Sequence, residues 1–234
     1  MSDGPAFYAR SGSAFGDLRT LFHPPYTLWH LSYVVIGASL APTVSLSLLA
    51  WTLLVFLLGL GVTAHALDEL NGHPLGTRLG NTTLLAMAIT ALAAGGVVVG
   101  LGSLSLSRWI WVWAVIGLFF AVAYPLERPA FVHTATGFAI SWGAYPVLAG
   151  FWVQAEEITA SAVIVAGFAA LLSAAQRSLS TPARFVRRGT TTAHADFDDT
   201  RWDRAELLAT WERPLRWLTG AVVVLAVGLL VSRL

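Results

Sequence analysis

Long runs of apolar residues, separated by short polar stretches, recur along the 234-residue chain. A helix needs about 20 apolar residues to cross the roughly 30 Å hydrocarbon core of a bilayer. We therefore predict an all-α, polytopic transmembrane helical bundle of about seven spans. The predicted spans cover residues 26–41, 44–66, 83–101, 109–122, 132–153, 158–174 and 215–231.

The composition supports a membrane location and argues against other classes of protein. Charged residues make up 12% of the chain and hydrophobic residues 56%, whereas soluble proteins carry about 25% charged residues. These values disfavour a soluble enzyme and a disordered chain. No basic run is long enough to follow the phosphates of a nucleic acid. The chain has no Cys, and all 14 of its basic residues are Arg, which excludes thiolate sites, disulfides and a Schiff-base lysine.

The arginines are distributed unevenly between alternate connections. If the N-terminus is cytoplasmic and there are seven spans, 12 of the 14 arginines lie inside, and Arg108 and Arg233 lie outside. Such an excess is typical of cytoplasmic loops. We therefore expect a multi-pass protein of a bacterial- or archaeal-type cytoplasmic membrane, with its N-terminus and its polar chemistry at the cytoplasmic face.

The chain is predicted to form a single membrane domain, residues 1–234. Within it, residues 18–188 form the main bundle, residues 189–213 a cytoplasmic interfacial segment, and residues 214–234 the final span. Segment 189–213 is the least apolar part of the chain. Its acidic residues Asp203 and Glu206, together with Leu208 and Trp211, predict an amphipathic helix that lies on the membrane surface.

The first polar cluster closes the second predicted span, in the sequence GVTAHALDELNGHPLGTR. His65, Asp68 and Glu69 are spaced i, i+3, i+4, so a helix would place them on one face. Ionisable groups at the end of a span are costly unless they are paired, hydrated or bound to a cation. Carboxylates with an imidazole can hold Mg²⁺ or a transition metal. The alternative is an ordinary helix end, in which Asn71-Gly72 supplies the left-handed residue.

Two further clusters lie on the same predicted side. In AYPLERPAFVHTATG, Tyr124 and Arg128 are four residues apart, and the guanidinium of Arg128 suits phosphate oxygens. In AAQRSLSTPARFVRR, Arg177 opens a group of four arginines after the sixth span. Both clusters are also compatible with simple anchoring to lipid headgroups.

Together these clusters resemble the UbiA superfamily of intramembrane aromatic prenyltransferases. The resemblance covers residues 18–188, and five stretches carry it. The entry LRTLFHPPYTLWHLSYVVIGASLAP is similar to the opening helix of the family, and AHALDELNGHPLG is similar to its first Asp-rich motif. YPLER matches a Tyr-x-x-x-Lys/Arg pattern, and TGFAISWGAYP is similar to the small-residue fifth helix. The loop after the sixth predicted span falls where the second Asp-rich motif lies.

The resemblance implies a UbiA-like bundle that transfers a prenyl group from an isoprenyl diphosphate to a lipophilic acceptor at the cytoplasmic face. It implies Mg²⁺ as cofactor, bound by Asp68 and Glu69. His65 would act as a further catalytic group with these two carboxylates. Tyr124, Arg128 and Arg177 would bind the diphosphate.

Two alternatives remain open at this point. The acids of the second motif are absent, because Gln176, Arg177 and Ser180 occupy that region. The protein would then be a non-catalytic accessory subunit that binds a lipid, quinone or pigment beside a membrane-protein partner. In the second alternative, His65, Glu69, His73 and His133 surround a transition metal.

Overall fold

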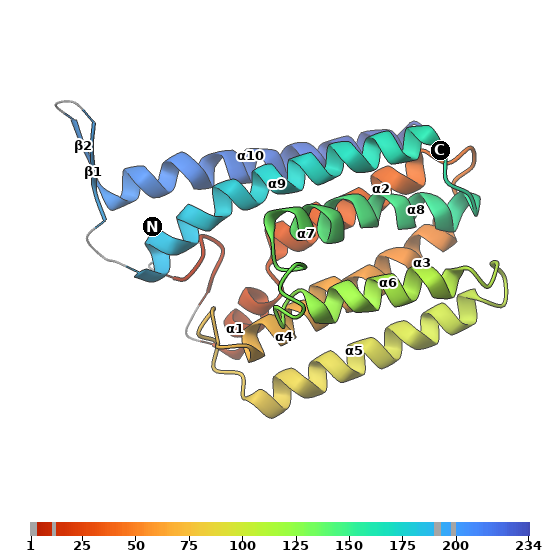
Figure 1. The fold of residues 1–234 in the computed structure, drawn as a ribbon, viewed down its shortest axis with the longest axis horizontal. Coiled ribbons are helices and arrows are strands. Elements are labelled where there is room, and N and C mark those ends of the chain that lie inside the picture. The colour runs from red at the N-terminus through yellow and green to blue at the C-terminus, as the bar shows by residue number, and fades with distance from the viewer. Residues whose placement is uncertain (1–3, 11–12, 190–192, 198–199) are drawn as a thin grey trace.

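The computed structural model describes residues 4–10, 13–189, 193–197 and 200–234 (Figure 1). Within them the fold is α-helical apart from one short hairpin, as the sequence predicts. The hairpin pairs β1 (Ala195–Phe197) with β2 (Thr200–Trp202) in antiparallel register. The helices are α1 (Ala14–Leu21), α2 (Pro24–Ser39), α3 (Leu46–Phe56), α4 (His65–Leu70), α5 (Asn81–Gly102), α6 (Ile110–Ala123), α7 (Ala135–Ala139), α8 (Tyr145–Ala155), α9 (Ala160–Gly189) and α10 (Arg204–Val231).

Two stretches of π-helix continue these helices without a break. The first, η1 (Leu57–Ala64), joins α3 to α4, and the second, η2 (Ile140–Ala144), joins α7 to α8. In a π-helix the hydrogen bond skips one more residue than in an α-helix, and such insertions are frequent at functional sites. The hydroxyl of Thr63 donates to the carbonyl oxygen of Leu58, five residues earlier, at 2.9 Å.

Helix α2 lies inside the bundle and packs most closely against α8 and α10. Its rings Trp29 and Tyr33 are fully buried, and the indole nitrogen of Trp29 donates to the Tyr33 hydroxyl at 2.6 Å. The contact with α8 is very close. A Cβ atom at Gly37 would lie 2.0 Å from the carbonyl oxygen of Val147. The absence of side chains at this crossing therefore lets the two backbones meet, as in other membrane bundles.

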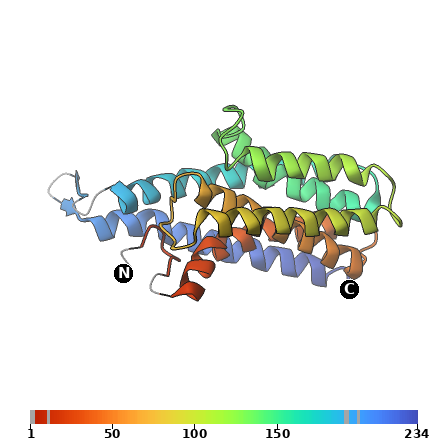
Figure 2. The same ribbon diagram turned by 90° about the horizontal axis from the view of Figure 1, so that it is seen from below.

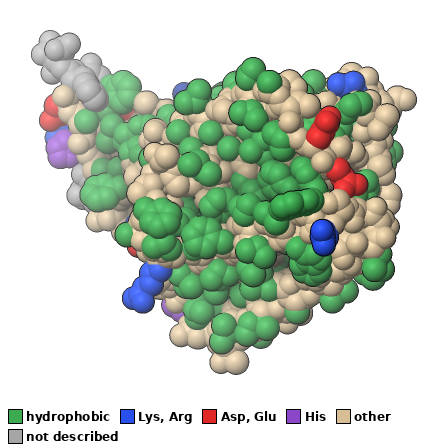
Figure 3. All heavy atoms as spheres, turned by 45° about the vertical axis from the view of Figure 1, so that its right-hand side comes forward, with side chains coloured by type: hydrophobic (Ala, Val, Ile, Leu, Met, Phe, Trp, Pro, Cys, Tyr) green, Lys and Arg blue, Asp and Glu red, His purple; other side chains and the backbone are tan. Residues whose placement is uncertain are grey.

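Four helical segments in the described chain are long and apolar enough to cross a membrane. They are Leu46–Leu70, Asn81–Gly102, Ala160–Gly189 and Arg204–Val231. At most 28% of the residues in their most apolar windows are buried inside the protein, so most of their apolar surface needs another apolar environment. Hydrophobic side chains indeed cover much of the face seen in Figure 3, and few charges interrupt them. These four helices indicate a multi-pass membrane protein.

The prediction of seven spans is wrong, because the other apolar runs form shorter or less apolar helices. Helix α2 has 16 residues and α6 has 14, which at 1.5 Å per residue gives about 24 Å and about 21 Å. The run from Ala135 to Ala155 is long enough to cross a membrane, but residues of low hydropathy such as Ser141 and Pro146 lower its mean hydropathy. The apolar runs of the sequence do not define where each helix begins and ends.

The N-terminus, α1, α4 and the hairpin gather at one end of the bundle, and the C-terminus lies at the other (Figures 1 and 2). Most of the arginine-bearing segments share this first end, which we call the arginine-rich end. At the opposite end, the side chain of Arg233 donates to the carbonyl oxygen of Ser39 at 2.8 Å. The charge asymmetry seen in the sequence is thus an asymmetry between the two ends of the fold.

The predicted interfacial helix is not separate from the last span. Helix α10 runs unbroken from Arg204 to Val231, and the boundary predicted between residues 213 and 214 lies within it. Asp203 caps its first turn through a reciprocal capping box with Glu206. The side chains of Arg187 on α9 and Glu212 on α10 form an ion pair, each about 3% exposed. This buried pair holds the first part of α10 against α9.

Candidate functional site

A polar cavity of about 130 Å³ lies at the arginine-rich end of the bundle. Its walls come from the N-terminal segment, α2, α4, the turn after α6, and α9. Cationic, anionic and neutral polar groups line it together with aromatic rings. The polar lining residues are Tyr8, His23, Tyr26, His30, His65, Asp68, Tyr124, His133, Gln176, Arg177, Ser180 and Arg184.

Four of the six residues selected from the sequence line this cavity, namely His65, Asp68, Tyr124 and Arg177. They come from two helices and one turn that are far apart in the chain. The fold therefore brings these four side chains to one cavity. The two remaining residues, Glu69 and Arg128, do not line the cavity.

Glu69 is fully buried and holds the loop that follows α4. Its carboxylate accepts hydrogen bonds from the backbone nitrogens of Leu75 and Thr77, both at 2.8 Å, and from the Thr77 hydroxyl at 2.9 Å. The loop itself starts at Gly72, whose φ of 98° is the left-handed turn expected from the Asn-Gly pair. The carboxylate of Glu69 therefore acts as a structural acceptor.

Tyr124 is the C-cap of α6, and its hydroxyl accepts a hydrogen bond from the guanidinium of Arg177 on α9. The same guanidinium lies 5.6 Å from the ring centre of Phe138. Burial raises the pKa of Tyr124 to about 12, so its phenol stays protonated at neutral pH. Because the oxygen already accepts from Arg177, its hydrogen remains for donation into the cavity. Arg128, four residues further on, is exposed.

The sequence did not point to several residues of the cavity, among them Tyr8, His23 and Arg184. His23 ends the loop before α2 and faces the cavity, where its ring stacks on His65 with centroids 4.2 Å apart. Arg184 follows Arg177 by seven residues, which is about two helical turns, so both lie on one face of α9. The spacing of the arginines could have indicated this face. No local signal indicates that a His before two prolines points inward.

The donor set does not fit a magnesium ion held jointly by Asp68 and Glu69. Mg²⁺ demands near-octahedral oxygen coordination, and both Glu69 oxygens already accept backbone hydrogen bonds. The described residues contain no group of three or more His, Asp or Glu side chains that could hold a metal ion. The transition-metal arrangement of His65, Glu69, His73 and His133 is therefore not assembled in the described chain. Of the four, Glu69 and His73 do lie close, with Oε1 3.5 Å from Nδ1, while Nε2 of His73 is hydrogen-bonded to the side-chain oxygen of Asn81 at 2.8 Å.

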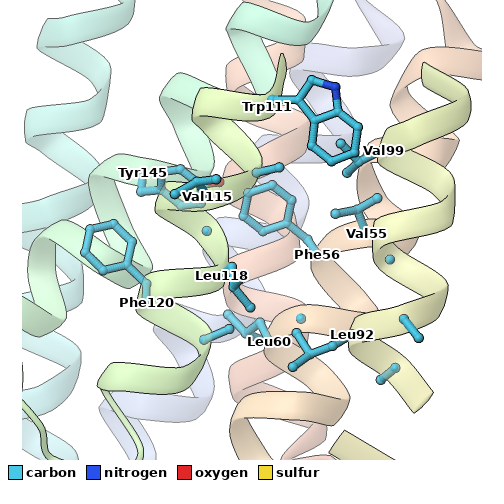
Figure 4. A pocket seen from close by; sticks show the side chains of 18 of the residues that line it. Val55, Phe56, Leu60, Leu92, Val99, Trp111, Val115, Leu118, Phe120 and Tyr145 are labelled. Carbon is cyan, nitrogen blue, oxygen red and sulfur yellow. The ribbon is translucent and has the colours of Figure 1, made fainter. Parts of the chain in front are cut away.

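A larger apolar cavity, about 530 Å³, opens between η1, α5 and α6 (Figure 4). Phe56, Leu60, Leu92, Leu118 and Phe120 are among the side chains that surround it (Figure 4). Leu60 and Trp142 line both this cavity and the polar one. The two cavities therefore share a wall, and each shared residue belongs to a π-helical segment.

No family model, no curated protein and no solved structure matches this chain.

Proposed function

We propose that the protein is a UbiA-like prenyltransferase that binds an isoprenyl diphosphate across the two cavities. The diphosphate occupies the polar cavity and the isoprenyl chain enters the apolar one. The observation that carries this proposal is that the two cavities are adjacent, because Leu60 and Trp142 line both of them. An amphiphile with an anionic head and a branched hydrocarbon tail fits two adjacent sites of such different polarity.

The charges of the polar cavity favour an anion. Arg177 and Arg184 supply two guanidinium groups, whereas Asp68 is the single carboxylate in the lining. Guanidinium groups pair with phosphate oxygens through parallel, charge-assisted hydrogen bonds. Inside a bundle these contacts are screened less than at a surface. From the sequence we expected a metal ion, held by Asp68 and Glu69, to neutralise the charge of the diphosphate. In this proposal the two arginines neutralise it instead.

Transfer of the prenyl group proceeds as follows. The allylic carbon–oxygen bond breaks, its electron pair stays on the oxygen, and diphosphate leaves against Arg177 and Arg184. The allylic cation takes an electron pair from the acceptor, which then loses a proton. The rings of Phe138 and Trp142 line the cavity and stabilise the cation through their π faces.

His65 is the group placed to take the proton. Its Nδ1 lies 3.2 Å from the carbonyl oxygen of Gly61, and because a carbonyl oxygen only accepts, Nδ1 carries the hydrogen. The other ring nitrogen, Nε2, then has a free electron pair. We place the site at the cytoplasmic face, since the arginine-rich end follows the positive-inside rule.

A second function is favoured by the position of Glu69. Since its carboxylate is committed to the loop at residues 71–77, one carboxylate alone faces the cavity. A protein with this lining can hold an anionic lipid, or seat a quinone or pigment, without reacting with it. It would then act as an accessory subunit beside a membrane-protein partner.

Binding and turnover separate the two functions. Purified protein in detergent is titrated with a non-hydrolysable farnesyl thiodiphosphate and with inorganic pyrophosphate, in magnesium and in EDTA. We expect both probes to bind, the farnesyl compound more tightly because its tail is buried. Release of diphosphate from farnesyl diphosphate by the wild-type protein supports the transferase. Binding without release supports the accessory subunit, and no binding of either probe overturns both.

A further inference from the structure

His23 is a buried residue held in an unusual backbone conformation at the N-terminus of α2. Its φ of 45° lies in the left-handed region, which non-glycine residues seldom adopt. The residue is 9% exposed and its ring lines the polar cavity. A residue stays in such a conformation only where the surrounding structure holds it there. Such residues are frequent at active sites and ligand-binding sites.

One ring nitrogen of His23 has a partner and the other does not. Nδ1 lies 2.6 Å from the hydroxyl oxygen of Tyr8. Nε2 is buried and makes no hydrogen bond within the part of the chain that the structure describes. A buried polar atom without a partner costs free energy, and each such atom calls for an explanation. The side-chain amide oxygen of Gln176, which lines the same cavity, is also buried and without a partner among the described residues.

Tyr8 belongs to a short N-terminal segment, residues 4–10, that is fixed to the helices. The carbonyl oxygen of Gly4 accepts a hydrogen bond from Arg187 at 3.2 Å. The guanidinium of Arg216 lies 4.9 Å from the ring centre of Phe7. After Tyr8, the backbone nitrogen of Arg10 donates to the Thr20 hydroxyl at 2.7 Å. Contacts before and after Tyr8 therefore hold its hydroxyl against His23.

The protonation of this pair is set by burial. Burial raises the pKa of the Tyr8 phenol, so Tyr8 keeps its hydrogen and donates it to Nδ1. Burial, followed by the charges of His65, Arg184 and Arg188, lowers the pKa of His23, so its ring is neutral. A neutral imidazole that accepts at Nδ1 carries its hydrogen at Nε2. The ring also stacks on His65 with an angle of 16° between the planes, which fixes its direction.

We propose that Nε2–H of His23 donates a hydrogen bond to a headgroup oxygen of the bound diphosphate, and that Tyr8 positions it for this contact. The inference rests on the proposed function and adds two residues to that site. His23 supplies a directional, uncharged donor beside Arg177 and Arg184. Tyr8 acts through His23 and is a positioning residue.

The test compares His23→Asn and Tyr8→Phe with the wild-type protein. Asn tolerates the left-handed region, so His23→Asn keeps the backbone conformation but is too short to place a donor at the position of Nε2. Glu156→Asn is the matched control, since Glu156 also has a positive φ of 52° and lies at the opposite end of the bundle. Thermal unfolding verifies that all three variants fold.

Loss of one hydrogen bond to a charged group corresponds to about a tenfold change in affinity. We expect His23→Asn to raise the Kd of pyrophosphate and of farnesyl thiodiphosphate about tenfold, and Glu156→Asn to leave both unchanged. In Tyr8→Phe, the ¹⁵N chemical shifts of His23 should show that the hydrogen is no longer confined to Nε2, and binding should weaken less than in His23→Asn. These ¹⁵N shifts report the tautomer of His23 in the absence of ligand.

The outcomes distinguish the two proposals. If the wild-type protein binds neither probe, the proposed function fails and this inference fails with it. If the wild-type protein binds both probes and His23→Asn binds them within twofold of wild type, the role of His23 alone is overturned. If the shifts of His23 are the same in wild type and Tyr8→Phe, the role of Tyr8 is overturned.

Discussion

Leu60 and Trp142 belong to one buried apolar cluster, and both line the polar and the apolar cavity. One comes from η1 and the other from η2. A π-helical insertion shifts the side chains that follow it around the helix axis by the extra residue. The two insertions thus lie where the walls of the two cavities meet.

The first prediction concerns the two arginines selected from the sequence. Arg177 lines the polar cavity, whereas Arg128 is exposed outside it. We expect Arg177→Gln to raise the Kd of farnesyl thiodiphosphate about tenfold or more, because a charge-assisted bond is lost. Arg128→Gln serves as the matched control and should bind as wild type. Equal losses in both variants, measured by calorimetry, would contradict the assignment of the cavity.

Asp68 provides a test of how the headgroup is neutralised. In the absence of a bridging metal its negative charge repels a diphosphate, so Asp68→Asn should bind pyrophosphate more tightly than wild type in EDTA. A carboxylate that instead held Mg²⁺ would give the opposite result, weaker binding in magnesium after the same substitution. Titrations in the two buffers therefore decide whether Asp68 serves a metal.

Glu69 should affect stability. The carboxylate accepts three hydrogen bonds from Leu75 and Thr77. In Glu69→Gln an amide NH₂ group faces backbone N–H donors, so we expect a loss of about 1–3 kcal/mol in the free energy of unfolding. Thermal unfolding in detergent measures it. An unchanged Tm would show that the loop does not depend on this side chain.

The stability should also depend on pH through His23. Its pKa in the folded protein is well below the usual 6.5. Between these two pKa values the unfolded chain binds a proton that the folded chain does not. The contribution of neutral His23 to the free energy of unfolding is therefore fully present above pH 6.5, and the free energy of unfolding decreases below that pH by up to about 1.4 kcal/mol per pH unit. Melting curves from pH 7.5 to 5.5 should show a smaller decrease in Tm for His23→Asn than for wild type. Parallel decreases would be evidence that His23 is protonated when folded.

The crossing of α2 and α8 gives a stability prediction away from the site. A Cβ at Gly37 would lie 2.0 Å from a backbone oxygen, whereas one at Gly100 meets nothing within 4 Å. We expect Gly37→Ala to destabilise the protein by about 1–3 kcal/mol or more, as overpacking does. Gly100→Ala in α5 should be neutral or slightly stabilising, since Ala favours helix. The two melting temperatures check the packing of the bundle core.

Several features of the fold could be predicted from local sequence. Apolar runs predicted the all-α membrane bundle, and Asn71-Gly72 predicted the left-handed end of α4, because both depend on short-range geometry. The number of spans could not be predicted in this way. An apolar run such as 26–41 is equally compatible with a span and with α2, a shorter helix buried by its neighbours.

Four of the residues selected from the sequence line the polar cavity. Tyr124 and Arg177 were both selected for the chemistry of their side chains. They are 53 residues apart in the chain, and the fold brings them into a hydrogen bond. His65, Asp68 and Glu69 were assigned to one helix face from their spacing. The structure separates Glu69 from the others, because the loop that folds back at Gly72 presents its N–H groups to this carboxylate.

The sequence by itself determined that the chain belongs in a membrane and that its charge collects at one end, since hydropathy and arginine placement are properties of the residues alone. Only the tertiary structure decided which of those charges share a cavity. Tyr8, His23, Asp68 and Arg184 are spread over four segments, and no spacing rule relates them. Their arrangement follows from the packing of the segments that carry them, such as α4 on α5 and α9 on α10, and the N-terminal segment on Arg187 and Arg216.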